Sequence, residues 1–222
     1  MKRLSLFALC WCCLAPIAGQ DIPEEQILRY DEVKTALDRT ECATHTAELS
    51  NDTLLTAFAK AAGYYPELCG VTIKIRYGAI KTSMAARPVL WSVVFNKRSH
   101  RKYLILINKN AESEQARLLY DASFNASVGV MGHELAHIAD YSTQSGWKII
   151  GTGIRYLGKK YRRKMERQTD STAIERGMGW QLYDYTYHVI HKADISEKYR
   201  QYKLTYYLTP EEISDRLLKT DR

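Results

Sequence analysis

Two stretches in the first half of the chain have the pattern of β-strands. Residues 71–77 (VTIKIRY) alternate apolar and polar side chains, and residues 102–108 (KYLILIN) are almost continuously apolar. Residues 79–87 form a weaker candidate, and 90–95 precede a polar segment, 96–101, that resembles a hairpin loop. These segments predict a small, mostly antiparallel sheet.

The rest of the chain repeats apolar positions at helical spacing. We expect helices over residues 23–37, 51–63, 112–122, 125–142, 160–176, onward to 192, and at 210–219. Asn125 is a candidate N-cap and Gly177 a candidate C-cap. Residues 147–158 are too short and too charged to span a bilayer, and predict a loop or a short amphipathic helix over a cleft. The pattern predicts one α+β domain over residues 21–222 with a helix-rich second half.

The predicted helix at 125–142 carries a candidate metal site. His133 and His137 are four residues apart, so both imidazoles lie on one face and can bind the same ion. Glu134 follows the first histidine, and its carboxylate can reach a water on that ion without binding the ion. Two buried histidines satisfied by hydrogen bonds are the alternative, but they leave the acid between them unexplained.

A catalytic zinc site needs a third protein ligand. Thr143 occupies the place of the third histidine in the extended form of this motif, which excludes that form. The next helix offers Glu166 and Asp170, four residues apart and therefore on one face. Glu166 would bind the metal, and Asp170 would accept a hydrogen bond from a ligand histidine. A solvated charged helix, with Arg162 paired to Glu166, is the alternative.

These two motifs resemble those of the gluzincin zinc peptidases, especially the group of the membrane prenyl-protein peptidases and their small soluble relatives. In that group the second helix carries Glu-x-x-Ala-Asp, and Thr169 stands here at the alanine position. The resemblance implies a minimal zincin-like fold, in which a small sheet precedes the active-site helix. It also implies one Zn²⁺ per chain bound by His133, His137 and Glu166, and Glu134 as general base.

The predicted activity is therefore zinc-dependent hydrolysis of peptide bonds, with a peptide or protein as substrate. The alternative is a non-catalytic, exported zinc-binding or scaffold protein, although structural zinc sites are usually closed sets of Cys and His. An edge strand from residues 79–95 or 102–108 could pair with the substrate. An extra donor for the oxyanion is expected from the segment after Glu166, and we favour His188 or a nearby tyrosine. The candidates in that segment are Tyr183, Tyr185, Tyr187, His188 and His191.

The N-terminal residues and the cysteines point to export. Residues 1–20 have a basic start and a short apolar core, which predicts a signal peptide and a periplasmic or extracellular protein. Beyond them, Cys42 and Cys69 form a candidate disulfide, with two unpaired buried thiols as the alternative. No transmembrane segment is expected in the mature chain.

The formal net charge is +7, and the densest basic cluster is residues 159–164 (KKYRRK). This cluster could contact an anionic membrane surface or acidic substrates, but the solvated start of a helix, balanced by acids elsewhere, is the favoured interpretation. Nucleic-acid binding is not expected, because the protein is predicted to be exported and the sequence contains no recognisable binding module.

Overall fold

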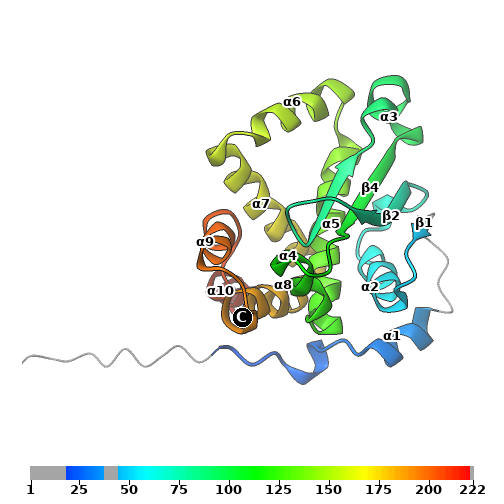
Figure 1. Ribbon diagram of the computed structural model, residues 1–222. Coiled ribbons are helices and arrows are strands. Elements are labelled where there is room, and N and C mark those ends of the chain that lie inside the picture. The colour runs from blue at the N-terminus through cyan, green and yellow to red at the C-terminus, as the bar shows by residue number, and fades with distance from the viewer. Residues whose placement is uncertain (1–18, 38–44, 221–222) are drawn as a thin grey trace, which may run out of the picture.

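The computed structural model describes residues 19–37 and 45–220 (Figure 1). The protein has an α+β fold that is mostly helical, with one small mixed sheet. Its helices are α1 (Tyr30–Leu37), α2 (Asp52–Ala62), α3 (Leu90–Phe95), α4 (Glu114–Tyr120), α5 (Phe124–Thr143), α6 (Gly146–Tyr156), α7 (Lys159–Ala173), α8 (Gly179–Tyr187), α9 (Glu197–Tyr206) and α10 (Pro210–Thr220). Short 3-10 turns at Glu24–Gln26, Pro66–Leu68 and Arg98–His100, and π turns at Ile174–Met178 and His188–Lys192, complete the helical structure.

The sheet has the strand order β1, β2, β4, β3. Strands β1 (His45–Glu48), β2 (Thr72–Gly78) and β4 (Lys102–Asn108) are parallel to one another. Only β3 (Met84–Pro88) is antiparallel, and it forms one edge of the sheet beside β4. The prediction of a mostly antiparallel sheet is therefore wrong, because it missed β1 and placed β2 and β4 in a chain of hairpins instead of side by side in parallel.

Residues Leu90–Phe95 account for part of this error, because they form helix α3 and no strand. The last ladder hydrogen bond before α3 runs from the Val89 amide to the Lys102 carbonyl oxygen, at 2.9 Å. Beyond it the chain turns away from β4. A six-residue apolar run fits a strand or a short helix equally well, so its pattern alone could not distinguish the two.

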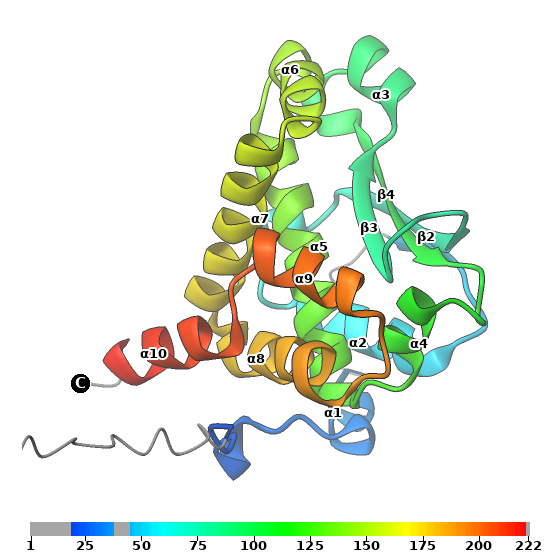
Figure 2. The same cartoon turned by 60° about the vertical axis from the view of Figure 1, so that its left-hand side comes forward.

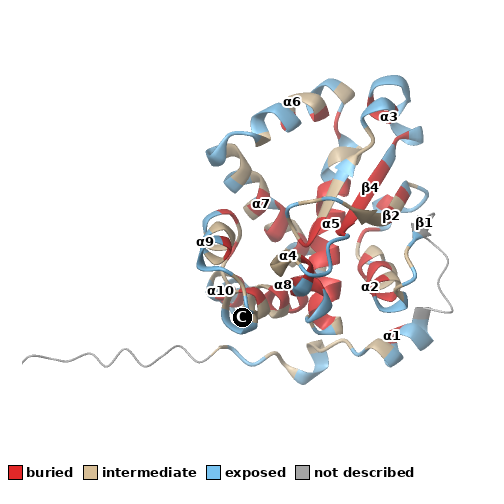
Figure 3. Ribbon diagram, viewed as in Figure 1, coloured by how far each residue is buried: buried red, intermediate tan, exposed pale blue. Residues whose placement is uncertain are grey.

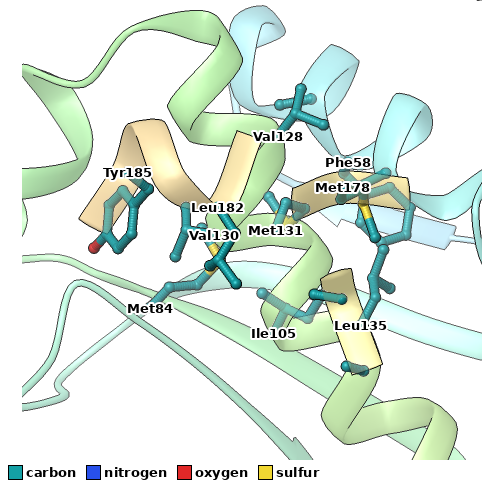
Figure 4. Close-up of a cluster of buried hydrophobic side chains, with 14 of the residues drawn as sticks. Phe58, Met84, Ile105, Val128, Val130, Met131, Leu135, Met178, Leu182 and Tyr185 are labelled. Atoms are coloured by element: carbon teal, nitrogen blue, oxygen red, sulfur yellow. The ribbon is translucent and has the colours of Figure 1, made fainter. Parts of the chain in front are cut away.

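Helix α5 lies at the centre of the molecule and is buried from Asn125 to Ala139 (Figure 3). Its side chains pack on those of α2, β4 and α8 in a continuous core, in which Phe58, Ile105, Met131, Leu135 and Leu182 meet (Figure 4). A methyl group at Gly129 would lie 2.2 Å from the Gln181 carbonyl oxygen, so glycine is what allows α8 to pack this closely on α5.

The caps of these helices differ partly from prediction. Helix α5 begins one residue earlier than expected and is capped by Ser123, whose hydroxyl accepts a hydrogen bond from the Ala126 amide at 2.9 Å. Asn125 lies inside the helix, where its side chain accepts from the Leu28 amide at 3.0 Å. Gly177 has a φ of 88°, a left-handed conformation that separates α7 from α8 as the sequence predicted.

Helix α6 forms the end of the molecule that lies farthest from α10, next to α3 (Figures 1 and 2). Residues 147–158 were expected to form a loop or a short amphipathic helix, and the helix is what the structure shows. Among the described residues, no helix has both the length and the apolar character needed to cross a membrane. Most of the predicted signal peptide, residues 1–18, lies outside the described residues. Cys69 is disulfide-bonded, whereas Cys42 lies outside the described residues.

Candidate metal centre

The packing of α5 against α7 brings His133, His137 and Glu166 together in the interior. The Nε2 atoms of His133 and His137 lie 3.2 and 3.3 Å from Oε2 of Glu166. All three side chains are buried, and one potential ligand atom from each lies within 4.8 Å of the others. Two turns of α5 and one residue of α7 thus aim three donor atoms at one point.

This donor set fits a metal ion. Oε2 of Glu166 is buried but has no hydrogen-bond partner, which is costly for a carboxylate oxygen unless a cation satisfies it. In a tetrahedral site with bonds of roughly 2.0–2.1 Å, neighbouring ligand atoms lie about 3.3–3.4 Å apart, which is close to the two distances observed. The buried group of His133, His137 and Glu166 could therefore hold a metal ion.

Both histidines are oriented by groups on α7. Nδ1 of His133 lies 2.8 Å from Oδ1 of Asp170, whose other oxygen accepts a hydrogen bond from the Leu208 amide at 2.8 Å. Nδ1 of His137 lies 3.3 Å from the Thr169 hydroxyl. With the Nδ1 atoms held in this way, both Nε2 atoms remain directed at Glu166. Asp170 thus lies where the sequence placed it, and Thr169 contributes a contact that an alanine could not make.

Tyr156, at the end of α6, also contacts the centre, and no sequence pattern pointed to it. Its hydroxyl donates a hydrogen bond to Oε1 of Glu166, which leaves Oε2 facing the two histidines. The residue lies ten positions before Glu166 on a different helix, so no helical spacing connects them. The metal centre is thereby linked to α6 as well as to α5 and α7.

Burial and charge determine the protonation of these groups. Burial favours the neutral imidazole of His133, but the carboxylates of Asp170 and Glu166 outweigh it and raise its pKa to about 10. Burial likewise favours the protonated form of Glu166, but His137 and His133 hold its pKa well below the ordinary value. In the absence of a metal, His133 therefore carries a proton that offsets part of the buried negative charge. A divalent cation would have to displace that proton.

Glu134 lies beside the centre and is not part of the donor set. Its Oε2 accepts a hydrogen bond from the Ala86 amide on β3. The amide belongs to the edge strand of the sheet, on the side away from β4. Glu134 also lines a cavity of about 1030 Å³, together with His133, His137, Glu166 and residues Met84–Pro88 of β3. The carboxylate therefore stands between the free edge of a strand and the three candidate ligands.

His188 is not brought to this centre. It lies on the π turn after α8, does not line the cavity, and has a buried Nε2 atom with no hydrogen-bond partner. Burial lowers its pKa, and the charged groups that act on it are Asp121, Asp184 and Lys192.

Tyrosines from other segments line the cavity in place of His188. They are Tyr141, Tyr156, Tyr199, Tyr202 and Tyr207. The ring of Tyr207 lies against that of His133, with the two ring centroids 5.6 Å apart. Burial raises the pKa of Tyr207 well above its ordinary value, and Glu166 raises it further, so its hydroxyl stays protonated and can donate. Tyr185 lines a smaller adjoining cavity and hydrogen-bonds to Ser83 at 2.7 Å.

Comparisons with models of protein families, with characterised proteins and with solved structures give no match.

Proposed function

We propose that this protein is a zinc-dependent metallopeptidase with a zincin-like active site. The observation that carries the proposal is the convergence of two imidazole nitrogens and an otherwise unpartnered carboxylate oxygen beside Glu134. A set of two histidines and one carboxylate is typical of catalytic zinc sites, in which the remaining position is left to water or substrate. Buried sites that serve only structure usually have four protein ligands, often cysteines.

Zinc bound by His133, His137 and Glu166 would lower the pKa of water and polarise a carbonyl oxygen. Glu134 accepts the proton of the attacking water and passes it to the nitrogen of the leaving amine. Its position beside the ligands, and outside the donor set, suits this role. Asp170 and Thr169 keep the two imidazoles in the orientation that binding requires.

The edge strand β3 suits an extended peptide substrate. Its free side faces the cavity, and the Ala86 amide on that side is a donor that either Glu134 or a substrate carbonyl can use. Pairing with β3 would lay a peptide along the cavity beside the three ligands. The predicted alternative, β4, is an interior strand with both sides occupied, so it does not offer an edge.

Tyr207 replaces His188 as our candidate for the oxyanion donor. Its ring lies beside His133 in the cavity lining, and its hydroxyl stays protonated. A neutral donor near the developing negative charge stabilises it without first having to gain a proton. We also infer that the protein is exported, because Cys69 is disulfide-bonded and such bonds persist mainly in oxidising compartments.

The test combines metal content with hydrolysis. The purified protein is expected to contain about one zinc per chain, measured by elemental mass spectrometry, and to cleave a quenched-peptide library. Glu134→Gln should keep its zinc and its fold while losing activity by a factor of about 10³ or more, because the amide cannot accept a proton. The exposed Glu175, on the turn after α7, supplies the matched control Glu175→Gln, which should behave as the wild type.

Three other outcomes would contradict the proposal. Activity retained in Glu134→Gln would disprove its role as base. Zinc bound without any hydrolysis would favour the non-catalytic zinc protein. A wild-type protein that binds no metal would show that the histidine motif is structural.

A further inference from the structure

Most of the exposed large apolar side chains gather at one end of the molecule. Among the described residues there are nine such side chains, and seven of them lie on α3, on α6 or directly after α6. We call these seven residues the apolar tip: Leu90, Trp91, Val94 and Phe95 on α3, and Trp147, Ile154 and Leu157 on and after α6. Trp147 is 85% exposed and Trp91 73% exposed. Monomeric proteins rarely leave such a cluster uncovered unless it binds something.

The two helices that carry the tip, α3 and α6, are held together by direct contacts. Arg101 donates a hydrogen bond to the Gln144 carbonyl oxygen at 2.6 Å, which ties the start of β4 to the residues before α6. Helix α6 then begins against α3, so closely that a methyl group at Gly146 would lie 3.0 Å from the Val93 carbonyl oxygen. Both helices occupy the same end of the molecule in two views, and both are largely exposed there (Figures 1, 2 and 3).

The two segments of the chain that contain the tip are rich in basic residues and lack acidic ones. Residues 68–111 and 141–165, which contain the tip, carry 16 lysines and arginines and no aspartate or glutamate. The rest of the chain carries the other 16 basic residues and all 25 acidic ones. Exposed basic side chains around the tip include Lys97, Arg98, Lys148, Arg155, Lys159 and Lys160. The last two begin the basic cluster 159–164, so that cluster continues the positive surface of the tip.

We propose that the apolar tip inserts into the interface of an anionic lipid bilayer. Tryptophan favours the interface between lipid headgroups and acyl chains, and basic residues beside it are attracted to anionic lipids. Two exposed tryptophans, five further apolar side chains and the exposed lysines and arginines beside them match those requirements.

The tip also adjoins the cavity of the metal centre. Leu90, Ile154 and Leu157 are exposed and at the same time line that cavity. A tip inserted in a bilayer therefore places the cavity beside the membrane surface. The docking goes beyond the proposed peptidase activity and does not depend on it, because neither the metal nor Glu134 takes part.

The experiment measures binding to lipid vesicles by flotation. The wild type is expected to bind vesicles that contain phosphatidylglycerol at least about tenfold more tightly than vesicles of phosphatidylcholine alone. The double variant Trp91→Ser/Phe95→Ser should lose at least about tenfold of that binding, since both side chains are exposed apolar groups at the tip. Leu218→Ser, which changes an exposed leucine on α10, is the control and should bind as the wild type does.

A local readout separates the tip from the N-terminal segment, which every variant shares. Bromine-labelled lipids should quench the fluorescence of Trp91 and Trp147 but spare Trp180, which is only 7% exposed. Trp91→Phe and Trp147→Phe should each remove part of the quenched signal while circular dichroism stays unchanged.

Several results would overturn the proposal. They are no binding to vesicles, equal binding to neutral and anionic vesicles, or undiminished binding by the double variant. A wild type that does not bind vesicles and forms a dimer, while the double variant is a monomer, would show instead that a second copy covers the tip.

Discussion

Asp170 shows how a side chain that binds no metal can still determine the centre. It is buried, contacts the imidazole of His133 with one oxygen and accepts the Leu208 amide with the other. It therefore fixes the orientation of one candidate ligand and ties that ligand to the residues just before α10. The sequence showed that Asp170 shares a face with Glu166, but the contact with Leu208 depends on a segment 38 residues away.

Asp170→Asn is expected to weaken zinc binding by roughly 10–100-fold without abolishing it, because the amide is a poorer acceptor for the imidazole N–H. Zinc affinity is measured by competition with a chromogenic chelator, and activity should recover in part with excess zinc. Asp215→Asn, at an exposed position on α10, is the control. Zinc affinity equal to that of the wild type would show that the contact with His133 contributes nothing to binding.

His188 should make stability sensitive to acid. Burial lowers its pKa in the folded protein below the ordinary value of 6.5, and its Nε2 atom has no partner. As the pH falls below that ordinary value, the unfolded chain takes up a proton that the folded chain resists, so stability declines. The decline ends once the pH is below the folded pKa.

We therefore expect His188→Gln to lose less stability than the wild type between pH 8 and pH 5. The free energy of unfolding in urea, measured at several pH values, gives the comparison. All other titrating groups are shared by the two proteins, so the difference reports on position 188. Identical pH profiles would mean that the imidazole is not protected from protonation.

At the scale of elements, the helices with strong periodicity were predictable, and those that depend on tertiary contacts were not. The pattern of 125–142 gave α5 almost to the residue, because its apolar stripe and its small residues are determined by packing along its whole length. Leu90–Phe95 was misread as a strand, because a short apolar run has no period of its own. β1 and α9 were missed, since one is four residues long and the other is largely polar.

The same distinction holds for the candidate site. His133, Glu134 and His137 are visible in the sequence because helical spacing brings them together on α5. Glu166 and Asp170 are visible for the same reason on α7. Tyr156, Ala86 and Tyr207 come to the centre from α6, β3 and the segment before α10. No local pattern encodes those positions, because they result from how the elements pack.

The close packing of α5 on α8 gives a prediction for the element scale. In Gly129→Ala the new methyl group would meet the backbone of Gln181 at 2.2 Å, so α8 must move. We expect a loss of about 1–3 kcal/mol or more in the free energy of unfolding. Gly153→Ala on α6 is the control: nothing lies within 4 Å of the added methyl group, and alanine favours the helix by about 0.5–1 kcal/mol. Equal stability of the two variants would show that α5 and α8 are not held so closely.

At the scale of the whole molecule, the candidate ligands join elements that are distant along the chain. α5 supplies two of them, α7 supplies the third, and Tyr156 and Asp170 extend the connection to α6 and to the start of α10. A metal that binds only the folded protein would stabilise all of these contacts together. The centre is thus expected to contribute to stability as well as to chemistry.

Removing the metal should therefore lower the melting temperature. Zinc at about 100 times its dissociation constant adds about 2.7 kcal/mol to the stability of the folded state. In a protein of this size that corresponds to a shift of roughly 5–11 °C, measured by calorimetry before and after chelation. Glu166→Gln should lose most of this dependence on zinc, since it removes the charged oxygen on which both imidazoles converge. A melting temperature that ignores both zinc and chelator would mean that the buried cluster is held by its proton alone, as an ion pair between His133 and its two carboxylates.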